Sequence, residues 1–163
     1  NVIIGMHART RCGVLTALLR PAVSRAEMKR CAERACALLQ SVSSDLHQRR
    51  NVLASSLPQA DRRRLEIARA LAAEPRIVLL DEPSSGMDDR DTDALIADIQ
   101  RLREGNPALG FIIIEHDMRL IATLPHRVMV LDYGRKIGDD SFEAVRRLPR
   151  VQEAYLGRKA SHA

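Results

Sequence analysis

The sequence predicts an α/β fold in which parallel strands are covered by helices, preceded by a helical segment. From residue 61 onward, short aliphatic runs alternate with stretches whose apolar residues recur at helical spacing. The runs are apolar on both faces, which is typical of strands buried in a parallel sheet between helices. No such run occurs in residues 1–60. We therefore expect a helical segment at 1–60 and an α/β region at 61–163.

Residues 1–60 are predicted to contain two helices and then a loop. The stretch GVLTALLRP indicates a short helix that ends before Pro21. Between Ala26 and Gln40, apolar residues recur at helical spacing with charged residues on the other side, which predicts an amphipathic helix. The stretch SVSSDLHQRRNVLASSLP is polar and aperiodic, so we expect a loop at 41–58.

The region 61–163 is predicted to alternate between helices and strands. Helices between consecutive strands indicate parallel βαβ units, and Gly134 suits a tight turn between the last two strands. The expected elements are a helix from residue 61 to before Pro75, the strand RIVLL at 76–80, a helix with Leu95, Ile96, Ile99 and Leu102 inward, the strand FIIIE at 111–115, a short helix around Met118–Ala122, the strand RVMVL at 127–131 and a short edge strand after Gly134.

The composition argues against two classes of protein. The formal net charge is +5, but the arginines are spread through helical stretches and aromatic residues make up only 2% of the chain. A nucleic-acid surface built on base stacking is therefore not expected. No apolar run reaches the ~18 residues that span a bilayer, and the first residues, NVIIGMHARTR, lack the layout of a signal peptide. We expect a soluble, intracellular protein.

Two carboxylates and an imidazole directly follow predicted strands. Asp81 and Glu82 come after RIVLL, and His116 comes after FIIIE. Ligands of open parallel sheets bind beyond the carboxyl ends of the strands, so these side chains are expected at one edge. Together they suit a metal ion, a phosphate and an activated water. Taken singly, the acids also fit a plain strand end, and His116 also fits a solvated residue or a helix cap.

Several motifs resemble those of ABC-transporter ATPases. In order and spacing, VLLDEP, SSGMD and IIIEHDM resemble the Walker B segment, the D-loop and the switch-histidine segment of that family. The resemblance runs from Asn1 to about Gly157, and it implies a partial P-loop NTPase core of the ABC ATPase type. In that reading, 1–60 is similar to the helical subdomain and 61–163 to the C-terminal part of the core. The stretches that resemble the ATP-binding subunits of branched-chain amino acid importers are HARTRCGVLTALLR, RRLEIARALAAEPRIVLLDEP and VQEAYLG.

The resemblance implies a role for each residue at the predicted sheet edge. Asp81 would hold the water shell of Mg²⁺, Glu82 would orient and polarise the attacking water, and His116 would contact the γ-phosphate. These residue types suit the chemistry, which needs a hard oxygen ligand, a proton acceptor and a donor to phosphate oxygens. The D-loop residues that would cross toward the second ATPase of a dimer are Gly86, Met87 and Asp88.

The sequence departs from the family at the phosphate-binding loop. It contains no G-x-x-x-x-G-K-[ST] stretch, whose backbone N–H groups and lysine cradle the phosphates in P-loop NTPases. We therefore expect the chain to be a C-terminal portion of such a subunit, lacking its N-terminal nucleotide-binding part. Without that part, the chain alone is not expected to bind or hydrolyse ATP.

A second departure lies in LPQAD at 57–61, where the family has a signature such as L-S-G-G-Q. Leu57 and Pro58 fit the subfamily, whereas Gln59, Ala60 and Asp61 do not. In the family this loop and the next helix offer N–H groups to the γ-phosphate bound by the partner subunit. Asp61 would place a negative charge near that phosphate. Alternatively, Asp61 is simply a favourable helix N-cap.

These features predict the ATP-hydrolysing subunit of an ABC importer, with ATP and Mg²⁺ as cofactors of the complete subunit. The expected partners are a second ATPase subunit and transmembrane permease subunits, with the protein peripheral on the cytoplasmic face of the plasma membrane. The assignment of branched-chain amino acids as the substrate rests on subfamily resemblance alone, because urea and amide importers have similar ATPases. The alternative is a non-catalytic truncated remnant or interaction module, which the missing loop and the altered signature favour.

Overall fold

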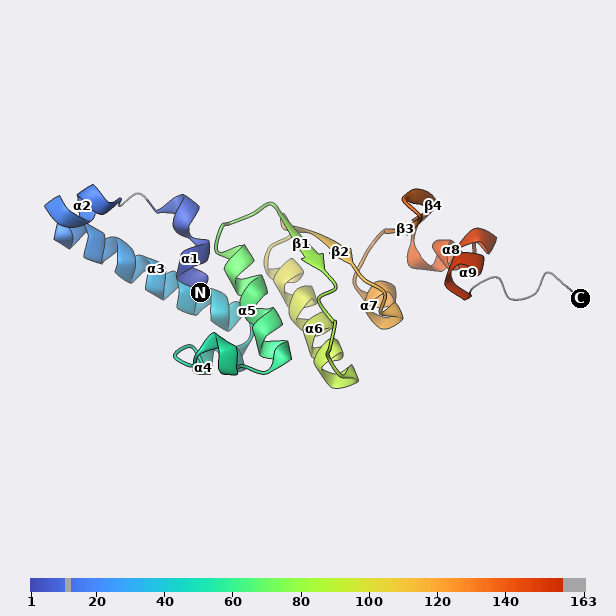
Figure 1. Ribbon diagram of the computed structural model, residues 1–163, viewed down its shortest axis with the longest axis horizontal. Helices are drawn as coiled ribbons and strands as arrows, with labels where there is room; N and C mark the ends of the chain where they lie inside the picture. Colours follow the sequence, from blue (N-terminus) through green and yellow to red (C-terminus); the bar gives the residue numbers. More distant parts are fainter. Residues whose placement is uncertain (11–12, 157–163) are drawn as a thin grey trace, which may run out of the picture. The chain divides into compact units, whose positions relative to one another are not determined.

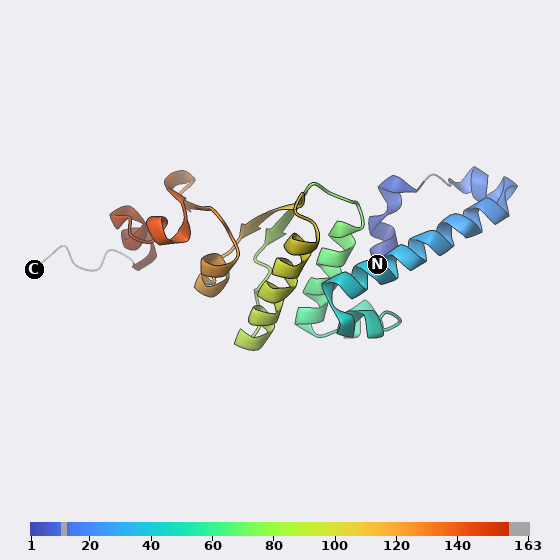
Figure 2. The same ribbon diagram turned by 180° about the vertical axis from the view of Figure 1, so that it is seen from behind.

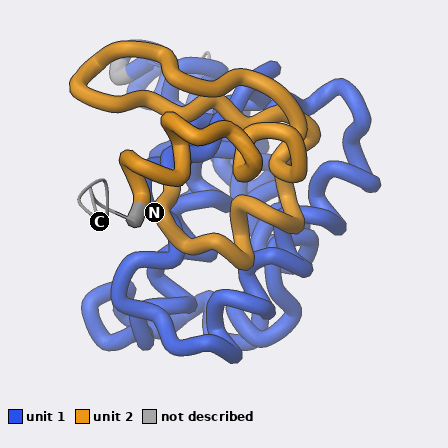
Figure 3. The backbone as a smooth tube through the Cα atoms, turned by 90° about the vertical axis from the view of Figure 1, so that its right-hand side faces the viewer, with its two compact units in different colours: residues 1–114 blue, residues 115–163 orange. Residues whose placement is uncertain are grey.

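The computed structural model describes residues 1–10 and 13–156, and the chain divides into two compact units, 1–114 and 115–163 (Figure 3). The helical segment and the first half of the α/β region belong to one unit. The domain boundary expected after residue 60 stays a prediction. The first unit contains α1 (Val2–Gly5), α2 (Val14–Leu19), α3 (Pro21–Val42), α4 (Ser44–Gln48), α5 (Gln59–Leu71), β1 (Ile77–Asp81), α6 (Asp89–Gly105) and β2 (Gly110–Ile114), with 3₁₀ turns at His7–Arg9 and Ala54–Ser56 (Figure 1). The second contains α7 (Met118–Thr123), β3 (Val128–Asp132), β4 (Arg135–Asp140), α8 (Phe142–Val145) and α9 (Pro149–Leu156).

The helices predicted before residue 43 are confirmed, but the loop predicted after them is wrong in part. Pro21 follows α2 and opens the longer α3, as its fixed φ and missing N–H allow at a first helical position. Residues 44–48 form the short helix α4, whose N-cap Ser43 accepts a hydrogen bond from the backbone of Leu46 at 3.3 Å. Leu46 is almost fully buried. One apolar residue gives no periodicity, so this short helix was not predicted from spacing.

The strands β1 and β2 form the predicted parallel pair. Their register places Ile77 opposite Gly110 and Asp81 opposite Ile114. The helices α5 and α6 lie side by side in both ribbon views (Figures 1 and 2). Val78 of β1 and Ile99 of α6 are both buried. The strands were predicted to be buried on both faces, but the other face of the pair is exposed. Its exposed aliphatic side chains are Ile77, Leu79, Ile112 and Ile114.

The third predicted strand, β3, pairs differently from the prediction. It is antiparallel to β4, and within residues 1–10 and 13–156 these two strands form a sheet of their own. The physical reason is the short connection: Tyr133 and Gly134 have φ of 44° and 77°, which makes a two-residue hairpin turn. The tight turn into a short final strand is thus confirmed. None of the described helices is both long enough and apolar enough to cross a membrane.

The turn residue Tyr133 gives a test of the hairpin. Its side chain is fully exposed, so its replacement removes no packing, while asparagine adopts a positive φ more readily. We expect Tyr133→Asn to stabilise the hairpin by ~1 kcal/mol, seen as about fivefold slower amide hydrogen exchange in β3 and β4. Tyr133→Ala is the control, because it removes the same ring but keeps the unfavourable φ. Equal exchange in the two variants would contradict this account.

A second test uses the charges around Asp139 in β4. Its carboxylate accepts hydrogen bonds from Lys136 at 2.7 Å and Arg127 at 2.6 Å, and these bonds lower the pKa of Asp139. Because the folded pKa lies below the unfolded value, the stabilisation is complete above pH ~4 and is lost as pH falls through the folded pKa. We expect Asp139→Asn to lower the melting temperature at pH 7 and to have no effect near pH 2. The control is Asp132→Asn, which removes an exposed carboxylate at the end of β3.

Candidate functional site

The carboxylates of Asp81 and Glu82 lie at the carboxyl end of the parallel strand pair. Asp81 is the last residue of β1, and both residues are exposed. The backbone N–H of Glu82 donates to the carbonyl of Ile114, at the end of β2, at 2.9 Å. Glu82 also has a φ of 43°, which non-glycine residues rarely adopt. The chain therefore turns sharply at the end of β1, and its hydrogen bond to β2 fixes this turn. As a result, two consecutive carboxylates lie at the sheet edge where ligands of α/β proteins bind.

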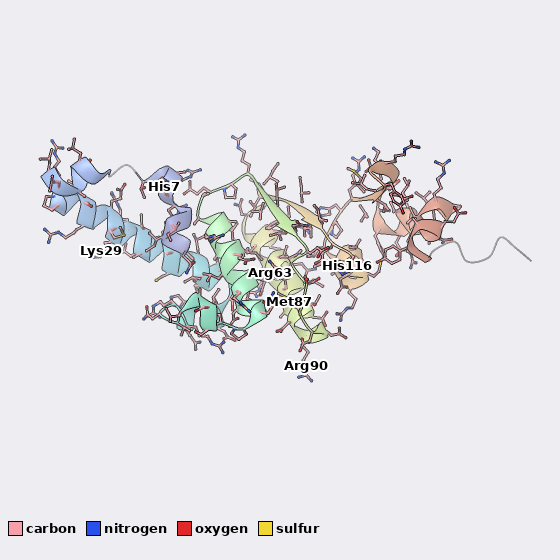
Figure 4. The ribbon with its side chains drawn as sticks, viewed as in Figure 1. His7, Lys29, Arg63, Met87, Arg90 and His116 are labelled. Carbon is pink, nitrogen blue, oxygen red and sulfur yellow. The ribbon has the colours of Figure 1, made fainter. Side chains whose placement is uncertain are left out.

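The predicted D-loop is a tight turn that leads into α6. Its first residue, Gly86, has a φ of 76°, and the N–H of Met87 donates to the carbonyl of Ser84 at 3.0 Å. Asp88 is the N-cap of α6, with its side chain accepting from the N–H of Asp91 at 2.8 Å. Met87 is labelled in Figure 4. The turn is thus built by local hydrogen bonds, and its position is set by the first turn of α6.

The residues of LPQAD lie where the chain enters α5. Leu57 is buried, Pro58 is the N-cap, and the 13-residue helix begins at Gln59. Ala60 and Asp61 are buried within the first turn. The interpretation of Asp61 as a helix N-cap is therefore wrong, because that position belongs to Pro58.

The carboxylate of Asp61 is held by two arginines. Arg49, at the end of α4, lies 2.7 Å from Oδ2, and Arg64, one turn further along α5, lies 3.4 Å from Oδ1. Only 6% of Asp61 is exposed. Its negative charge is therefore compensated inside the protein and does not stand unopposed near the start of α5. Sequence spacing could have suggested the i,i+3 pair with Arg64, but not the pair with Arg49.

Arg64 extends these contacts to α6. Its Nε donates to Asp98 Oδ2 at 2.6 Å, and Arg101 also pairs with Asp98, which is 4% exposed. Burial lowers the pKa of Arg64, but hydrogen bonding and attraction to Asp98 and then Asp61 outweigh it, so the pKa is raised overall. We call the set Arg49, Asp61, Arg64, Asp98 and Arg101 the Arg64 network. With three arginines and two aspartates, it carries a net charge of +1. Asp98 was not a candidate from sequence.

His116 belongs to the second unit, two residues after Ile114, whereas Asp81 and Glu82 belong to the first. The sequence position of His116 is therefore all that connects it to these two carboxylates. Its side chain is 71% exposed (Figure 4). The buried carboxylate of Glu115 accepts the N–H groups of His116 and Asp117 at 2.9 and 3.3 Å. The His116 carbonyl accepts from the hydroxyl of Tyr155 at 2.9 Å. The backbone that carries the imidazole is thus fixed within its own unit.

Across the described ranges 1–10 and 13–156, no three or more His, Cys, Asp or Glu side chains gather in a way that could hold a metal ion. Magnesium rarely needs such a cage, because it keeps several waters and is usually bound by one or two carboxylates together with substrate phosphates. The exposed carboxylate of Asp81 fits that mode of binding.

Comparison with solved structures shows which class of fold this is. The chain resembles a nucleotide-free ATP-binding cassette of an ABC transporter, with a TM-score of 0.70 and 22% identity over 96% of this chain and 62% of that chain. A second ATP-binding cassette of an ABC transporter gives a TM-score of 0.69 and 23% identity over 78% of this chain and 51% of that one. The fold is that of ABC ATP-binding cassettes.

Sequence comparison finds a matching family and similar proteins. Residues 6–85 match the profile of the ABC transporter family. The high-affinity branched-chain amino acid transport ATP-binding protein LivG of Escherichia coli (strain K12) is 32% identical over 157 residues, 96% of this chain. BraF of Pseudomonas aeruginosa, which carries the same description, is 34% identical over the same length. Residues 6–85 thus carry part of an ABC transporter domain, and the chain spans 60% of the length of these two relatives.

The buried position of Asp61 leads to a stability prediction. Asp61→Gln removes the charge that Arg49 and Arg64 share and leaves a buried guanidinium with one partner fewer. We expect a loss of ~1–3 kcal/mol in the free energy of unfolding, measured by urea denaturation. Asp45, an exposed aspartate in the first turn of α4, is the matched control, and Asp45→Asn should cost only a few tenths of a kcal/mol. Equal effects of the two changes would mean that Asp61 does no more than favour the helix end.

Proposed function

We propose that the chain is the ATP-hydrolysing part of an ABC importer subunit, with Asp81 and Glu82 acting on Mg·ATP. The observation that carries this proposal is the pair of exposed carboxylates at the carboxyl end of β1, turned outward by a backbone that β2 holds through the Glu82 N–H. The match of residues 6–85 to the ABC transporter family and the similarity to LivG support it.

Each carboxylate has a distinct proposed task. Asp81 would hold Mg²⁺ through the waters of the ion, and the ion would supply positive charge to the phosphate oxygens. Glu82 would orient the attacking water and accept its proton. Glu82 lies one residue beyond the strand, on a sharply turned backbone, whereas Asp81 is the last residue of the strand, and this difference suits two different targets.

The other candidates are proposed to serve the nucleotide of a second ATPase. The first turn of α5, from Gln59 to Asp61, would offer N–H groups to the γ-phosphate, as helix N-termini do for anions. The net charge of +1 on the Arg64 network removes the repulsion expected from Asp61. The D-loop at 86–88 would reach the same partner, and His116 would donate to the γ-phosphate. A dimeric ABC cassette among the similar solved structures supports this arrangement.

Branched-chain amino acids are the proposed transported substrate. LivG and BraF are both described as ATP-binding proteins of high-affinity branched-chain amino acid transport, which supports this substrate class. The substrate would be selected by permease subunits, to which the ATPase would dock on the cytoplasmic face of the plasma membrane. ATP hydrolysis would drive that import.

A second candidate function is a non-catalytic interaction module. The specific observations in its favour are the lack of a G-x-x-x-x-G-K-[ST] stretch in these 163 residues and the replacement of the signature by LPQAD.

A chimera with LivG separates the two candidates. The part of E. coli LivG that this chain matches would be replaced by the chain, so that LivG supplies the remaining 40% of its length. We expect magnesium-dependent ATPase activity that falls at least about 100-fold in Glu82→Gln, because the proton acceptor is lost. Glu66→Gln is the control: Glu66 is an exposed carboxylate that pairs with Arg63 on α5, and its loss should leave the rate nearly unchanged.

Two further measurements complete the test. The 163-residue chain alone sets the background rate, which is expected to be zero because it has no phosphate-binding loop. Binding of a fluorescent ATP analogue shows whether the chimera is folded and loaded. A chimera that binds ATP without hydrolysing it would favour the interaction module.

A further inference from the structure

We infer that Arg64 is a positioning residue, which fixes the start of α5 against α6 so that the segments 57–61 and 86–88 form one rigid surface. What this surface acts on rests on the proposed function, whereas its rigidity is a property of this chain alone.

The inference begins with the central place of Arg64 in the Arg64 network. Two different nitrogens of its guanidinium contact two different carboxylates, Nη1 with Asp61 at 3.4 Å and Nε with Asp98 at 2.6 Å. The planar fork of arginine allows this division, whereas a single lysine ammonium has to choose one carboxylate or stand between both. Arg64 therefore links α5 to α6 by one side chain.

The other two arginines of the network cannot supply that link. The side chains of Arg49 and Arg101 are 50% and 56% exposed, while that of Arg64 is 13% exposed. Each outer arginine contacts only one of the two aspartates. Water can replace much of what an outer arginine provides, but it replaces a buried guanidinium poorly because the two carboxylates are themselves buried.

The link is connected to the D-loop on two sides, through the start of α5 and along α6. Asp61 lies two residues after Gln59, whose side chain lies next to Gly86: a Cβ built on Gly86 would be 4.0 Å from Cγ and Nε2 of Gln59. Asp98 lies on the helix whose N-cap is Asp88. Asp61 is thus part of the segment whose Gln59 lies next to Gly86, and Asp98 is part of the helix that follows Asp88. Through these two aspartates, the Arg64 link would hold 57–61 and 86–88 in one geometry.

The test measures amide hydrogen exchange in the 163-residue chain. We expect Arg64→Lys to speed exchange at least about tenfold in 57–61 and 84–88, because the start of α5 is released locally. The matched control is Arg69→Met, an exposed arginine of the same helix, which should leave both segments unchanged. Unchanged exchange in Arg64→Lys would overturn the inference.

A double variant separates positioning from plain stability. Arg64→Met leaves Asp98 with Arg101 alone and Asp61 with Arg49 alone. Arg64→Met with Asp98→Leu also removes the buried carboxylate nearest to Arg64, so that less buried charge is left without compensation. We expect the double variant to regain most of the urea midpoint that Arg64→Met loses, while exchange in 57–61 stays fast. Recovery of slow exchange along with the midpoint would show a merely structural role and overturn the inference.

The LivG chimera gives the functional readout. We expect Arg64→Lys to lower kcat about tenfold with little change in KM for ATP, because the surface serves the reacting state. A normal kcat despite fast exchange in 57–61 would overturn the role of this surface in hydrolysis. The chimera without the Arg64 substitution is measured first. If it does not hydrolyse ATP, the proposed function fails; if it does, the effect of Arg64→Lys tests the role of this surface alone.

Discussion

The parallel pairing of β1 with β2 is the constraint on which the placement of the carboxylates depends. Register determines which side chains face the helices, and a slip of one residue would turn Val78 outward and bring its neighbours in. The same register sets Ile114 opposite Asp81, so that the carbonyl of Ile114 is available to the N–H of Glu82, the residue after β1. The apolar residues of the strands thus select the register, and the register places the carboxylates of Asp81 and Glu82 at the edge of the sheet.

The helices that support this pair are oriented by two different kinds of interaction. Burial of aliphatic side chains such as Ile67 of α5 and Ile99 of α6 is non-directional, and it tolerates small rotations of one helix against the other. The buried ion pairs add direction, because a displaced guanidinium would leave Asp61 or Asp98 desolvated without compensation. Packing therefore supplies most of the stability of this layer, and the charges define its geometry.

The sequence predicted those parts of the structure that depend on local pattern. The strand around Val78 and the helix around Leu95 follow from apolar runs and helical spacing, and the edge position of Asp81 follows from parallel topology. Features that depend on distant residues were missed. The helix around Leu46 has too few apolar residues to show a period, and the partner of Asp61 comes from a segment twelve residues earlier in the chain.

The conformation of Glu82 has a consequence for how this position evolves. At a φ of 43°, the backbone favours glycine or asparagine over glutamate by ~1 kcal/mol. Random substitution under selection for folding alone would drift toward the smaller residues, since few other side chains tolerate this turn. A chain that keeps a long carboxylate here retains a residue that its own backbone disfavours. The amino acid at this one position in close relatives is therefore a record of whether their lineages stayed under selection for chemistry.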